Sequence, residues 1–280
     1  MKEIVLISGK GGTGKTSLVA SFAALSAKAV RADCDVDAAD LPLVLTPTVR
    51  WREVFRCGQE AVIRPNDCIG CGGCLARCRF EAVRKTEGGA GEAKFTVDAT
   101  ACEGCGVCVW ACPVKAIAFP ERLSGEWFVS ETRYGPMVHA PLTPGGENSG
   151  KLVCTVREAA RSLAEERRAD LILVDGPPGI GCAVIASVSG ASQIVVVTEP
   201  TLSGAHDMER VLELARHFAI PSAVCVNKWD LNPEMTAQIE DRARQADPAV
   251  TRAQIQGKTA VEWPEARAAD DIRAVWEHMT

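Results

Sequence analysis

The sequence has no long hydrophobic run and no excess of positive charge, and it contains only four histidines. No apolar stretch approaches the roughly 18–20 residues of a membrane-spanning helix, so we expect no membrane partner. The formal net charge of −5 makes a nucleic-acid partner unlikely, because nucleic-acid binding favours a basic surface. The histidines are scattered and lack the spacing of a metal-binding motif.

No secretory signal peptide is recognisable at the start of the chain, where residues 1–7 have the character of a strand. A secreted disulfide framework is one way to use thirteen cysteines. Closely clustered cysteines in a chain without a signal peptide instead indicate metal binding in a reducing compartment. We therefore expect a cytoplasmic protein with reduced cysteines.

Two copies of one cysteine spacing, C-x2-C-x2-C-x3-C, dominate the middle of the chain. They are Cys68, Cys71, Cys74 and Cys78, then Cys102, Cys105, Cys108 and Cys112, which Pro113 follows. This is the spacing of bacterial ferredoxins, in which the fourth cysteine of each run ligates the other four-iron, four-sulfur (4Fe-4S) cluster. One cluster is therefore expected on Cys68, Cys71, Cys74 and Cys112, and a second on Cys102, Cys105, Cys108 and Cys78. The alternative is zinc, although zinc ribbons use two separated CxxC pairs. Arg79 stands where a proline is expected after the first run.

A glycine-rich segment at residues 8–16, Ser-Gly-Lys-Gly-Gly-Thr-Gly-Lys-Thr, matches a nucleotide-binding P-loop. Glycines let backbone N–H groups close around phosphate oxygens. Lys15 is expected to reach the β- and γ-phosphates of ATP, and the Thr16 hydroxyl to bind Mg²⁺. A fortuitous glycine-rich turn is the alternative, but the full pattern lies between an expected strand and an expected helix. The ATP-binding candidates here are Gly9, Lys10, Gly11, Gly12, Thr13, Gly14, Lys15, Thr16 and Ser17.

Short apolar runs alternate with helical periodicity outside the cysteine-rich segment, which predicts an α/β fold with a mainly parallel sheet covered on both faces. The expected strands are Ile4–Ile7, the start of Ala29–Asp40, Leu171–Val174, Gln193–Val197 and Ser222–Val226. The expected helices are Thr16–Ala29, Lys151–Arg168, Cys182–Val188, Ser203–Phe218 and Pro233–Gln245. Residues 125–147 suggest a β-hairpin that turns at Gly135-Pro136.

The change in composition predicts an insertion. Residues 57–122 form a small α+β ferredoxin-like domain with two similar halves. Residues 1–56 and 123–280 form the two parts of one P-loop domain.

The P-loop and four later motifs together resemble the MinD/ParA/nitrogenase iron protein class, whose deviant P-loop carries an early lysine, here Lys10. Asp33–Asp37 resembles the switch I of that class, and Asp175–Gly179 resembles its switch II. Thr198–Pro200 resembles the turn after the strand that follows switch II in that class. Asn227-Lys228 resembles its base-side loop, which lies beside the nucleotide base. With the insertion, the chain is similar to MinD-superfamily ATPases that carry a ferredoxin domain.

The resemblance implies roles for individual residues. Lys10 would reach a nucleotide across an interface with a second subunit, either a copy of this chain or a related ATPase. Lys10, Lys15 and Asp35 would be catalytic, with Asp35 orienting the attacking water. Thr16, Asp35 and Asp175 are the candidate Mg²⁺ residues, with Asp175 in the hydration shell of the ion. Asn227 and Lys228 would lie beside the base.

Several residues keep two interpretations. Asp33, Asp37 and Asp40 are either part of the site or solvated loop carboxylates, and Asp37 could also cap a helix. Cys182, just past switch II, could ligate a bridging cluster or simply pack. Packing is the default for the remaining cysteines, which are Cys34, Cys57, Cys154 and Cys225.

The motifs predict a slow, partner-stimulated ATPase that binds ATP or ADP, Mg²⁺ and two 4Fe-4S clusters. Its expected function couples nucleotide-dependent dimerisation to electron transfer toward an unidentified redox or metalloprotein client. Assembly or delivery of a metal cluster is the alternative, although no CxxC lies outside the insertion. Spatial organisation of the MinD/ParA type is less favoured, because residues 267–280 lack the basic surface of a membrane-binding helix.

Overall fold

The computed structural model describes residues 1–87, 93–143, 149–246, 251–255 and 268–279. These residues form two compact units. Unit 1 comprises Met1–Glu53, Trp127–Pro141 and the described residues from Ser149 onward, and unit 2 comprises Val54–Glu126 and the segment that begins at Leu142. The two boundaries of unit 2 fall within strands β3 and β8, which carry the chain into the insertion and out of it.

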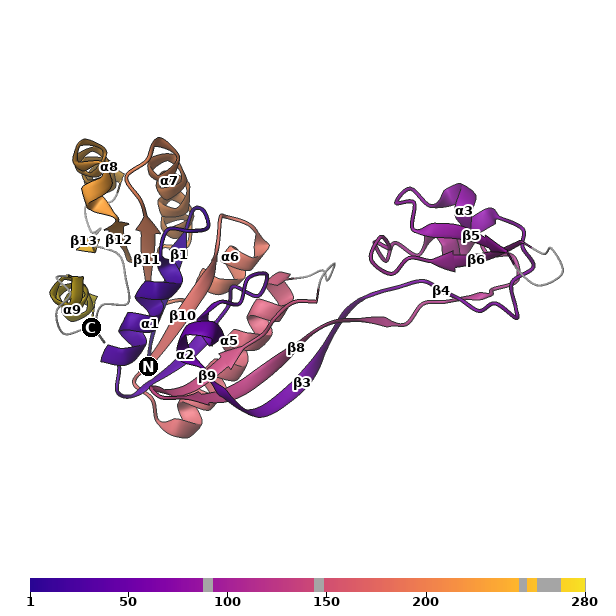
Figure 1. The fold of residues 1–280 in the computed structure, drawn as a ribbon, viewed down its shortest axis with the longest axis horizontal. Coiled ribbons are helices and arrows are strands. Elements are labelled where there is room, and N and C mark those ends of the chain that lie inside the picture. The colour runs from indigo at the N-terminus through magenta and orange to yellow at the C-terminus, as the bar shows by residue number, and fades with distance from the viewer. Residues whose placement is uncertain (88–92, 144–148, 247–250, 256–267, 280) are drawn as a thin grey trace. The chain divides into compact units, whose positions relative to one another are not determined.

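The described part of unit 1 is built on a nine-stranded sheet in the order β13-β12-β11-β1-β10-β2-β9-β8-β3 (Figure 1). Neighbouring strands from β13 to β9 pair in parallel, and β8 runs antiparallel to β9. The strands are β1 (Lys2–Ser8), β2 (Ala29–Asp33), β3 (Thr48–Gln59), β8 (Glu121–Thr132), β9 (Gly135–His139), β10 (Leu171–Pro178), β11 (Gln193–Thr198), β12 (Ser222–Asn227) and β13 (Thr251–Ile255). The predicted mainly parallel α/β sheet is confirmed.

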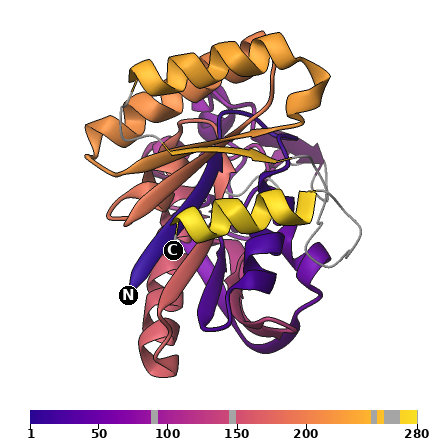
Figure 2. The same ribbon diagram turned by 90° about the vertical axis from the view of Figure 1, so that its left-hand side faces the viewer.

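Helices cover both faces of this sheet. Those of unit 1 are α1 (Lys15–Leu25), α2 (Leu41–Leu45), α5 (Ser149–Arg167), α6 (Cys182–Val188), α7 (Leu202–His217), α8 (Pro233–Ala246) and α9 (Ala268–Met279), with a 3₁₀ turn η2 (Trp229–Leu231). The connection through α1 runs from β1 toward β2, whereas the connections through α5 to α8 run in the opposite direction along the sheet. Because crossovers between parallel strands are right-handed, α1 lies on one face of the sheet and α5 to α8 lie on the other. Figure 2 shows α8 and α9 on opposite sides of the sheet.

The hydrophobic core under α1 joins the two ends of the chain. Phe22 of α1 is fully buried and its ring lies 5.3 Å from that of Trp276 in α9. Ile272 and Met279 of α9 are buried in the same cluster, together with Leu41 of α2. These contacts hold α9 against the sheet. The periodicity of the sequence did not reveal this helix.

The hairpin of β8 and β9 turns at a different place from the one predicted. Thr132 pairs with Gly135, so the two turn residues are Arg133 and Tyr134 rather than Gly135-Pro136. The Thr132 hydroxyl donates to the Gly135 carbonyl oxygen (2.8 Å) and accepts from the Tyr134 N–H (3.1 Å). Gly135 is favoured because its φ of 115° is one that other residues rarely adopt, and a Cβ there would also lie 2.7 Å from Nη1 of buried Arg31. The predicted hairpin over 125–147 begins earlier, at Glu121, and residues 144–147 lie outside the described part of the chain.

Unit 2 repeats one small motif. Its elements, besides the ends of β3 and β8, are β4 (Val62–Ile63), α3 (Gly73–Arg77), β5 (Val83–Glu87), β6 (Ala93–Val97), α4 (Val107–Ala111) and β7 (Ile117–Ala118). Strand β4 pairs antiparallel with β7, and β5 pairs antiparallel with β6. The short helices α3 and α4 pack on each other. Six of the eight cysteines of the two runs belong to the small core of this unit, with Phe95 and Ile117 among their neighbours, whereas Cys71 and Cys105 are exposed.

Candidate functional site

The carboxyl ends of three parallel strands bring together three residues that are far apart in the sequence. Lys15 follows β1 and begins α1, Asp35 follows β2, and Asp175 lies in β10. The ammonium nitrogen Nζ of Lys15 bonds Oδ1 of Asp175 and lies 3.3 Å from Oδ2 of Asp35. Lys15 and Asp175 are buried, and Asp35 nearly so. Two carboxylates and one lysine therefore meet at the carboxyl edge of the sheet, where open α/β folds bind ligands.

Burial and charge act together on this cluster. Asp33 is fully buried at the end of β2, and its burial and the charge of Asp175 raise its pKa well above the usual range. Burial alone would lower the pKa of Lys15, but the charges of Asp175 and Asp35 outweigh it and raise the pKa. Lys15 therefore remains charged at neutral pH.

Besides Oγ of Ser222 at the start of β12, three buried side-chain oxygen atoms of the described residues, in the P-loop, β2 and β10, lack a hydrogen-bond partner. They are Oδ2 of Asp33, Oδ2 of Asp175 and Oγ1 of Thr13. An unpaired buried polar group costs about 1–3 kcal/mol, so a polar ligand would be stabilising here. Carboxylate and hydroxyl oxygens are the ligands that Mg²⁺ prefers. The donor set fits a hydrated Mg²⁺ ion beside a phosphate group.

One wall of the P-loop is formed by Asn227, the last residue of β12. The Asn227 side chain donates from Nδ2 to the carbonyl oxygen of Thr13 (2.7 Å). At Gly14, with φ of 90°, a Cβ would lie 2.2 Å from that same nitrogen. Gly14 is therefore favoured for two reasons, the left-handed backbone conformation and the close contact with Asn227. Asn227 thus holds the loop at the end of β12.

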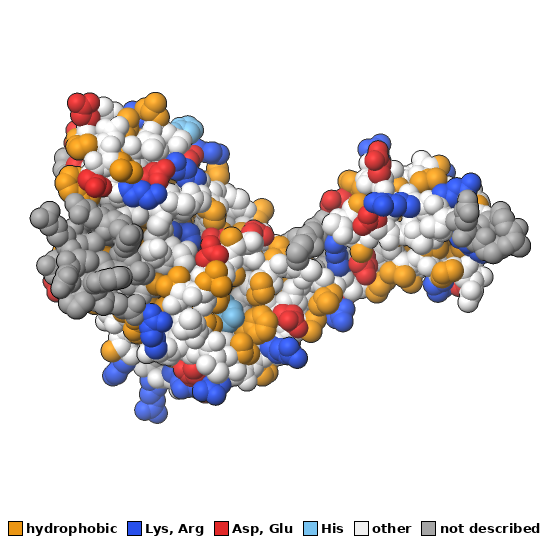
Figure 3. Space-filling model, in the orientation of Figure 1, with side chains coloured by type: hydrophobic (Ala, Val, Ile, Leu, Met, Phe, Trp, Pro, Cys, Tyr) orange, Lys and Arg blue, Asp and Glu red, His pale blue; other side chains and the backbone are white. Residues whose placement is uncertain are grey.

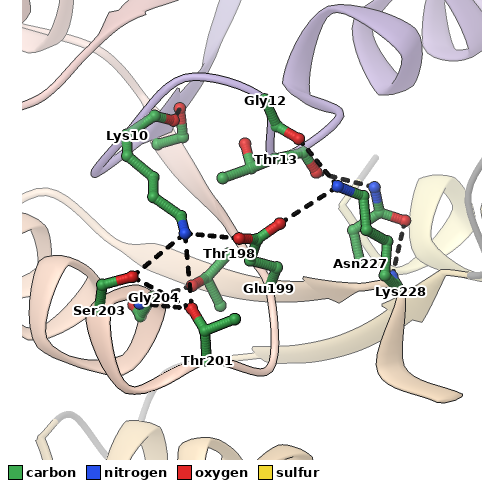
Figure 4. Close-up of polar contacts among 11 residues, drawn as sticks. Lys10, Gly12, Thr13, Thr198, Glu199, Thr201, Ser203, Gly204, Asn227 and Lys228 are labelled. Carbon is green, nitrogen blue, oxygen red and sulfur yellow. Dashed lines mark hydrogen bonds and ion pairs between the residues drawn. The ribbon is translucent and has the colours of Figure 1, made fainter. Parts of the chain in front are cut away.

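Lys10 and Lys228 share one carboxylate, Glu199, at the end of β11 (Figure 4). Nζ of Lys10 lies 2.5 Å from Oε1 of Glu199, and Nζ of Lys228 lies 3.1 Å from Oε2. Lys228 also donates to the carbonyl oxygen of Gly12 (3.0 Å). Sequence reasoning placed Glu199 in a turn motif and gave it no role. The sequence signal that could have identified Glu199 is its position, since it is an acidic residue directly after a buried strand.

The other predicted residues of the nucleotide site lie around this centre. Thr16 and Ser17 are half-buried in the first turn of α1. Asp37 and Asp40 are exposed, as solvated loop carboxylates would be. Asp40 is the N-cap residue of α2, but its side chain makes no capping hydrogen bond. For Asp33 the solvated interpretation is wrong, because neighbouring strands bury it completely.

In unit 2 the cysteines surround two separate cavities. One cavity is lined by Cys68, Cys71, Cys74 and Cys112, with Ile63, Phe95 and Ile117 among the apolar residues. The other is lined by Cys78, Cys102, Cys105 and Cys108, with Ala82, Val83 and Phe119. Each cavity thus takes three cysteines from one run and the fourth from the other run. Four thiols around an apolar cavity fit a 4Fe-4S cluster, and their grouping supports the ligand sets proposed from the spacing.

Two cationic side chains hold the backbone at the first cysteine of each run. Nζ of Lys94 donates to the carbonyl oxygen of Cys68 (2.8 Å). Arg122, which is buried, donates from Nη1 to the carbonyl oxygen of Cys102 (3.2 Å) and from Nη2 to that of Ala99 (2.8 Å). A positive charge beside each ligand set would favour the reduced, more negative form of a cluster. Neither residue was singled out in the sequence, because neither lies within a cysteine run.

The remaining cysteines differ in exposure. Cys34, Cys57 and Cys225 are buried, and burial raises the pKa of Cys225 to about 12. These three behave as packed apolar side chains. Cys154 and Cys182 are exposed, with Cys182 at the start of α6 just after the switch II segment.

On the face of unit 1 displayed in Figure 3, basic and acidic side chains lie intermingled. No helix among the described residues is long and apolar enough to cross a membrane.

Comparison with known proteins found similarities for both parts of the chain. Residues 61–119 match the model of a family described as a 4Fe-4S dicluster domain. A Methanocaldococcus jannaschii protein named "Uncharacterized protein MJ0578" is 35% identical over 240 residues, which cover 82% of this chain and 79% of that protein.

Among solved structures, the MinD cell division protein of Aquifex aeolicus aligns with a TM-score of 0.56 at 19% identity, covering 100% of this chain and 96% of that one. The septum site-determining protein MinD of Pyrococcus horikoshii OT3, complexed with Mg-ADP, aligns with a TM-score of 0.54 at 16% identity, covering 99% and 95%. At these identities the likeness establishes the fold, a MinD/ParA-type P-loop fold with an insertion.

Proposed function

This chain belongs to the family of MinD-like P-loop ATPases with an inserted 4Fe-4S dicluster domain, and from that premise we propose that it uses ATP binding and hydrolysis to control electron transfer. Two subunits would associate in the presence of ATP, and hydrolysis would separate them. Electrons would pass through two 4Fe-4S clusters to a redox partner or a metalloprotein client. The observation that carries the proposal is that one chain holds both the Lys15 cluster and the two cysteine-lined cavities.

At the nucleotide site, each residue has a task that its position supports. Lys15 would exchange its carboxylate partners for phosphate oxygens, which leaves Asp35 and Asp175 free. Asp175, with the Thr16 hydroxyl, would then hold the hydrated Mg²⁺, and Asp35 would orient the attacking water. A bound Mg²⁺ supplies charge neutralisation at the phosphates. The Mg-ADP in the similar fold of Pyrococcus MinD supports this assignment.

A ladder of paired strands leads from switch I toward the insertion. Asp33 at the end of β2 pairs with His139 of β9, and His139 pairs with Phe128 of β8. Strand β8 is continuous back to Glu121, at the end of the insertion. Switch loops rearrange when a γ-phosphate is lost, so a shift near Asp33 could reach β8 through backbone hydrogen bonds. This path is the physical basis that we propose for coupling.

The nucleotide part of the proposal is tested with Lys10→Ala and Lys15→Ala in the full, anaerobically purified protein. Lys15→Ala should lose ATP binding, as in any P-loop protein. Lys10→Ala should still bind ATP but should lose ATP-dependent dimerisation and hydrolysis, because Lys10 acts on the nucleotide of a second subunit. Hydrolysis by a monomeric Lys10→Ala variant at the wild-type rate would contradict the dimeric mechanism.

The electron-transfer part is tested by redox titration monitored by EPR. Two clusters require about eight irons per chain, with matching sulfide. The midpoint potentials or the affinity for the partner should differ between MgATP and MgADP, and Asp35→Asn, which slows hydrolysis, should keep the ATP-type values. Identical potentials and identical partner binding in all states would refute coupling. Iron that transfers to an apoprotein client would favour the alternative role in cluster assembly.

A further inference from the structure

The ammonium group of Lys10 has all of its hydrogen-bonding capacity occupied within its own chain. An ammonium has three N–H donors and no acceptor. Nζ of Lys10 lies 2.5 Å from Oε1 of Glu199, 3.1 Å from Oγ of Ser203 and 3.5 Å from Oγ1 of Thr201 (Figure 4). The first contact is a charge-assisted hydrogen bond, the strongest of the three. Lys10 is therefore held by one carboxylate and two hydroxyls.

The acceptors for Lys10 come from one tightly constrained turn between β11 and α7. Thr201 caps α7 by accepting a hydrogen bond from the Gly204 N–H (3.0 Å), and the Thr198 hydroxyl donates to the Gly204 carbonyl oxygen (2.9 Å). A Cβ on Gly204 would lie 2.3 Å from the carbonyl oxygen of Glu199, so no side chain fits there. The turn is thus built so that Glu199, Thr201 and Ser203 face the lysine.

Glu199 carries a charge and connects two points of the P-loop. Hydrogen bonding from Lys10 holds the pKa of Glu199 below its usual range, against the opposing effect of burial. The carboxylate is therefore ionised at neutral pH. Through Lys228, which donates to the Gly12 carbonyl oxygen, the same carboxylate is tied to the opposite side of the loop. The side chain of Glu199 is only 16% exposed, which limits screening by water.

We propose that Glu199 is a positioning residue that holds Lys10 on its own subunit and so sets the ATP concentration at which two subunits associate. This inference rests on the proposed function, in which Lys10 contacts the nucleotide of a second subunit. Before that contact can form, Lys10 must leave Glu199, and the cost of breaking this ion pair opposes dimerisation. Lys228 remains on Glu199 as a second partner, so the carboxylate is not left unpaired after Lys10 leaves.

The test is Glu199→Gln in the full protein with its clusters, which preserves the size of the side chain and removes its charge. Glu199→Gln should lower the ATP concentration for half-maximal dimerisation about tenfold, which corresponds to about 1.4 kcal/mol. Sedimentation velocity in the presence of Mg²⁺ and a range of ATP concentrations measures this midpoint. A gain in dimerisation is not what a simple loss of structure produces, because structural damage would raise the midpoint.

Glu209→Gln is the matched control. Glu209 also lies on α7 and pairs with a basic residue, Arg242, at 3.2 Å, but both side chains are largely exposed. The control should dimerise at the wild-type ATP concentration. If Glu199→Gln folds poorly, Ser203→Ala leaves the ion pair in place and removes the 3.1 Å hydrogen bond to Lys10, together with the 3.3 Å contact to the Thr201 hydroxyl. It should shift the midpoint in the same direction by a smaller factor.

The outcomes separate this inference from the proposed function. Wild-type dimerisation by Lys10→Ala would refute the role of Lys10 itself, and with it the proposed function. If Lys10→Ala fails to dimerise but Glu199→Gln and Ser203→Ala need as much ATP as the wild type or more, only the holding role of Glu199 is overturned. In the Lys10→Ala background, Glu199→Gln should leave the protein monomeric at every ATP concentration. ATP-dependent dimerisation of the double variant would show that Glu199 acts through Lys228 and would also overturn the inference.

Discussion

His139 lies at the end of β9, directly beside Asp33 in the strand ladder, and is buried. Its ring stacks on Phe128 with centroids 5.2 Å apart, and its Nε2 lies 2.9 Å from Oγ of Ser130. Burial lowers the pKa of His139 from 6.5 to about 4. We predict that this part of the sheet loses stability as the pH falls, because the folded protein binds the His139 proton more weakly than the unfolded chain does.

The magnitude follows from the difference between the two pKa values. Since the folded-state pKa is the lower one, the unfolded chain binds more protons between about pH 6.5 and pH 4, and stability is lost as the pH falls through that window. The difference of about 2.5 pKa units, multiplied by 1.36 kcal/mol per unit, gives a limit of roughly 3 kcal/mol. Between pH 7 and pH 5 the expected loss is about 2 kcal/mol.

Native-state amide hydrogen exchange of peptides from β8 and β9 measures this loss locally. The His139→Gln variant cannot ionise at this position, so its opening free energy should change between pH 7 and pH 5 by about 2 kcal/mol less than that of the wild type. His217→Gln is the control, because His217 is exposed near the end of α7, and it should keep the wild-type pH dependence. Equal pH dependence in wild type and His139→Gln would show that the histidine does not titrate as reasoned.

Three further outcomes are expected. Cys112→Ser should damage the cluster bound mainly by the first cysteine run, and Cys78→Ser should damage the cluster bound mainly by the second. EPR should therefore show the loss of a different signal in each variant, and loss of the same signal in both would contradict the crossed ligand sets. Gly204→Ala should lower the melting temperature by several degrees, because its Cβ would meet the Glu199 backbone at 2.3 Å. Arg122→Gln should lower the midpoint potential of the cluster bound mainly by the second run, because it removes a buried positive charge, and an unchanged potential in a redox titration would refute this.

The motifs that hold ligands were readable from the sequence because their parts are close together along the chain. The cysteine spacing follows from the size of a cluster, and the P-loop follows from the path of a backbone around phosphate. Buried parallel strands such as β1 and β12 were also predictable, since strands covered on both faces are continuous apolar runs. Helix α6, Cys182–Val188, was predicted to the residue.

Strand β3 shows where local sequence stops being informative. Most of its twelve residues are exposed, so it has neither a continuous apolar run nor a clear alternation. It is a strand because β8 lies beside it and pairs with it. The hairpin turn at Arg133 and Tyr134 was missed for a similar reason, since Gly135 is favoured in part by its closeness to buried Arg31, a residue on another strand.

The centre of the nucleotide site was only partly determined by the sequence. Asp33, Asp37 and Asp40 occur in one acidic stretch, and nothing local distinguishes them. The tertiary structure buries Asp33 between neighbouring strands and leaves the other two in solvent. Lys10 and Glu199 belong to motifs that the sequence displays, but their ion pair joins residues that are far apart in the sequence. Only the parallel order of β11 next to β1 brings the two loops together, because the carboxyl ends of adjacent parallel strands lie on the same edge of the sheet.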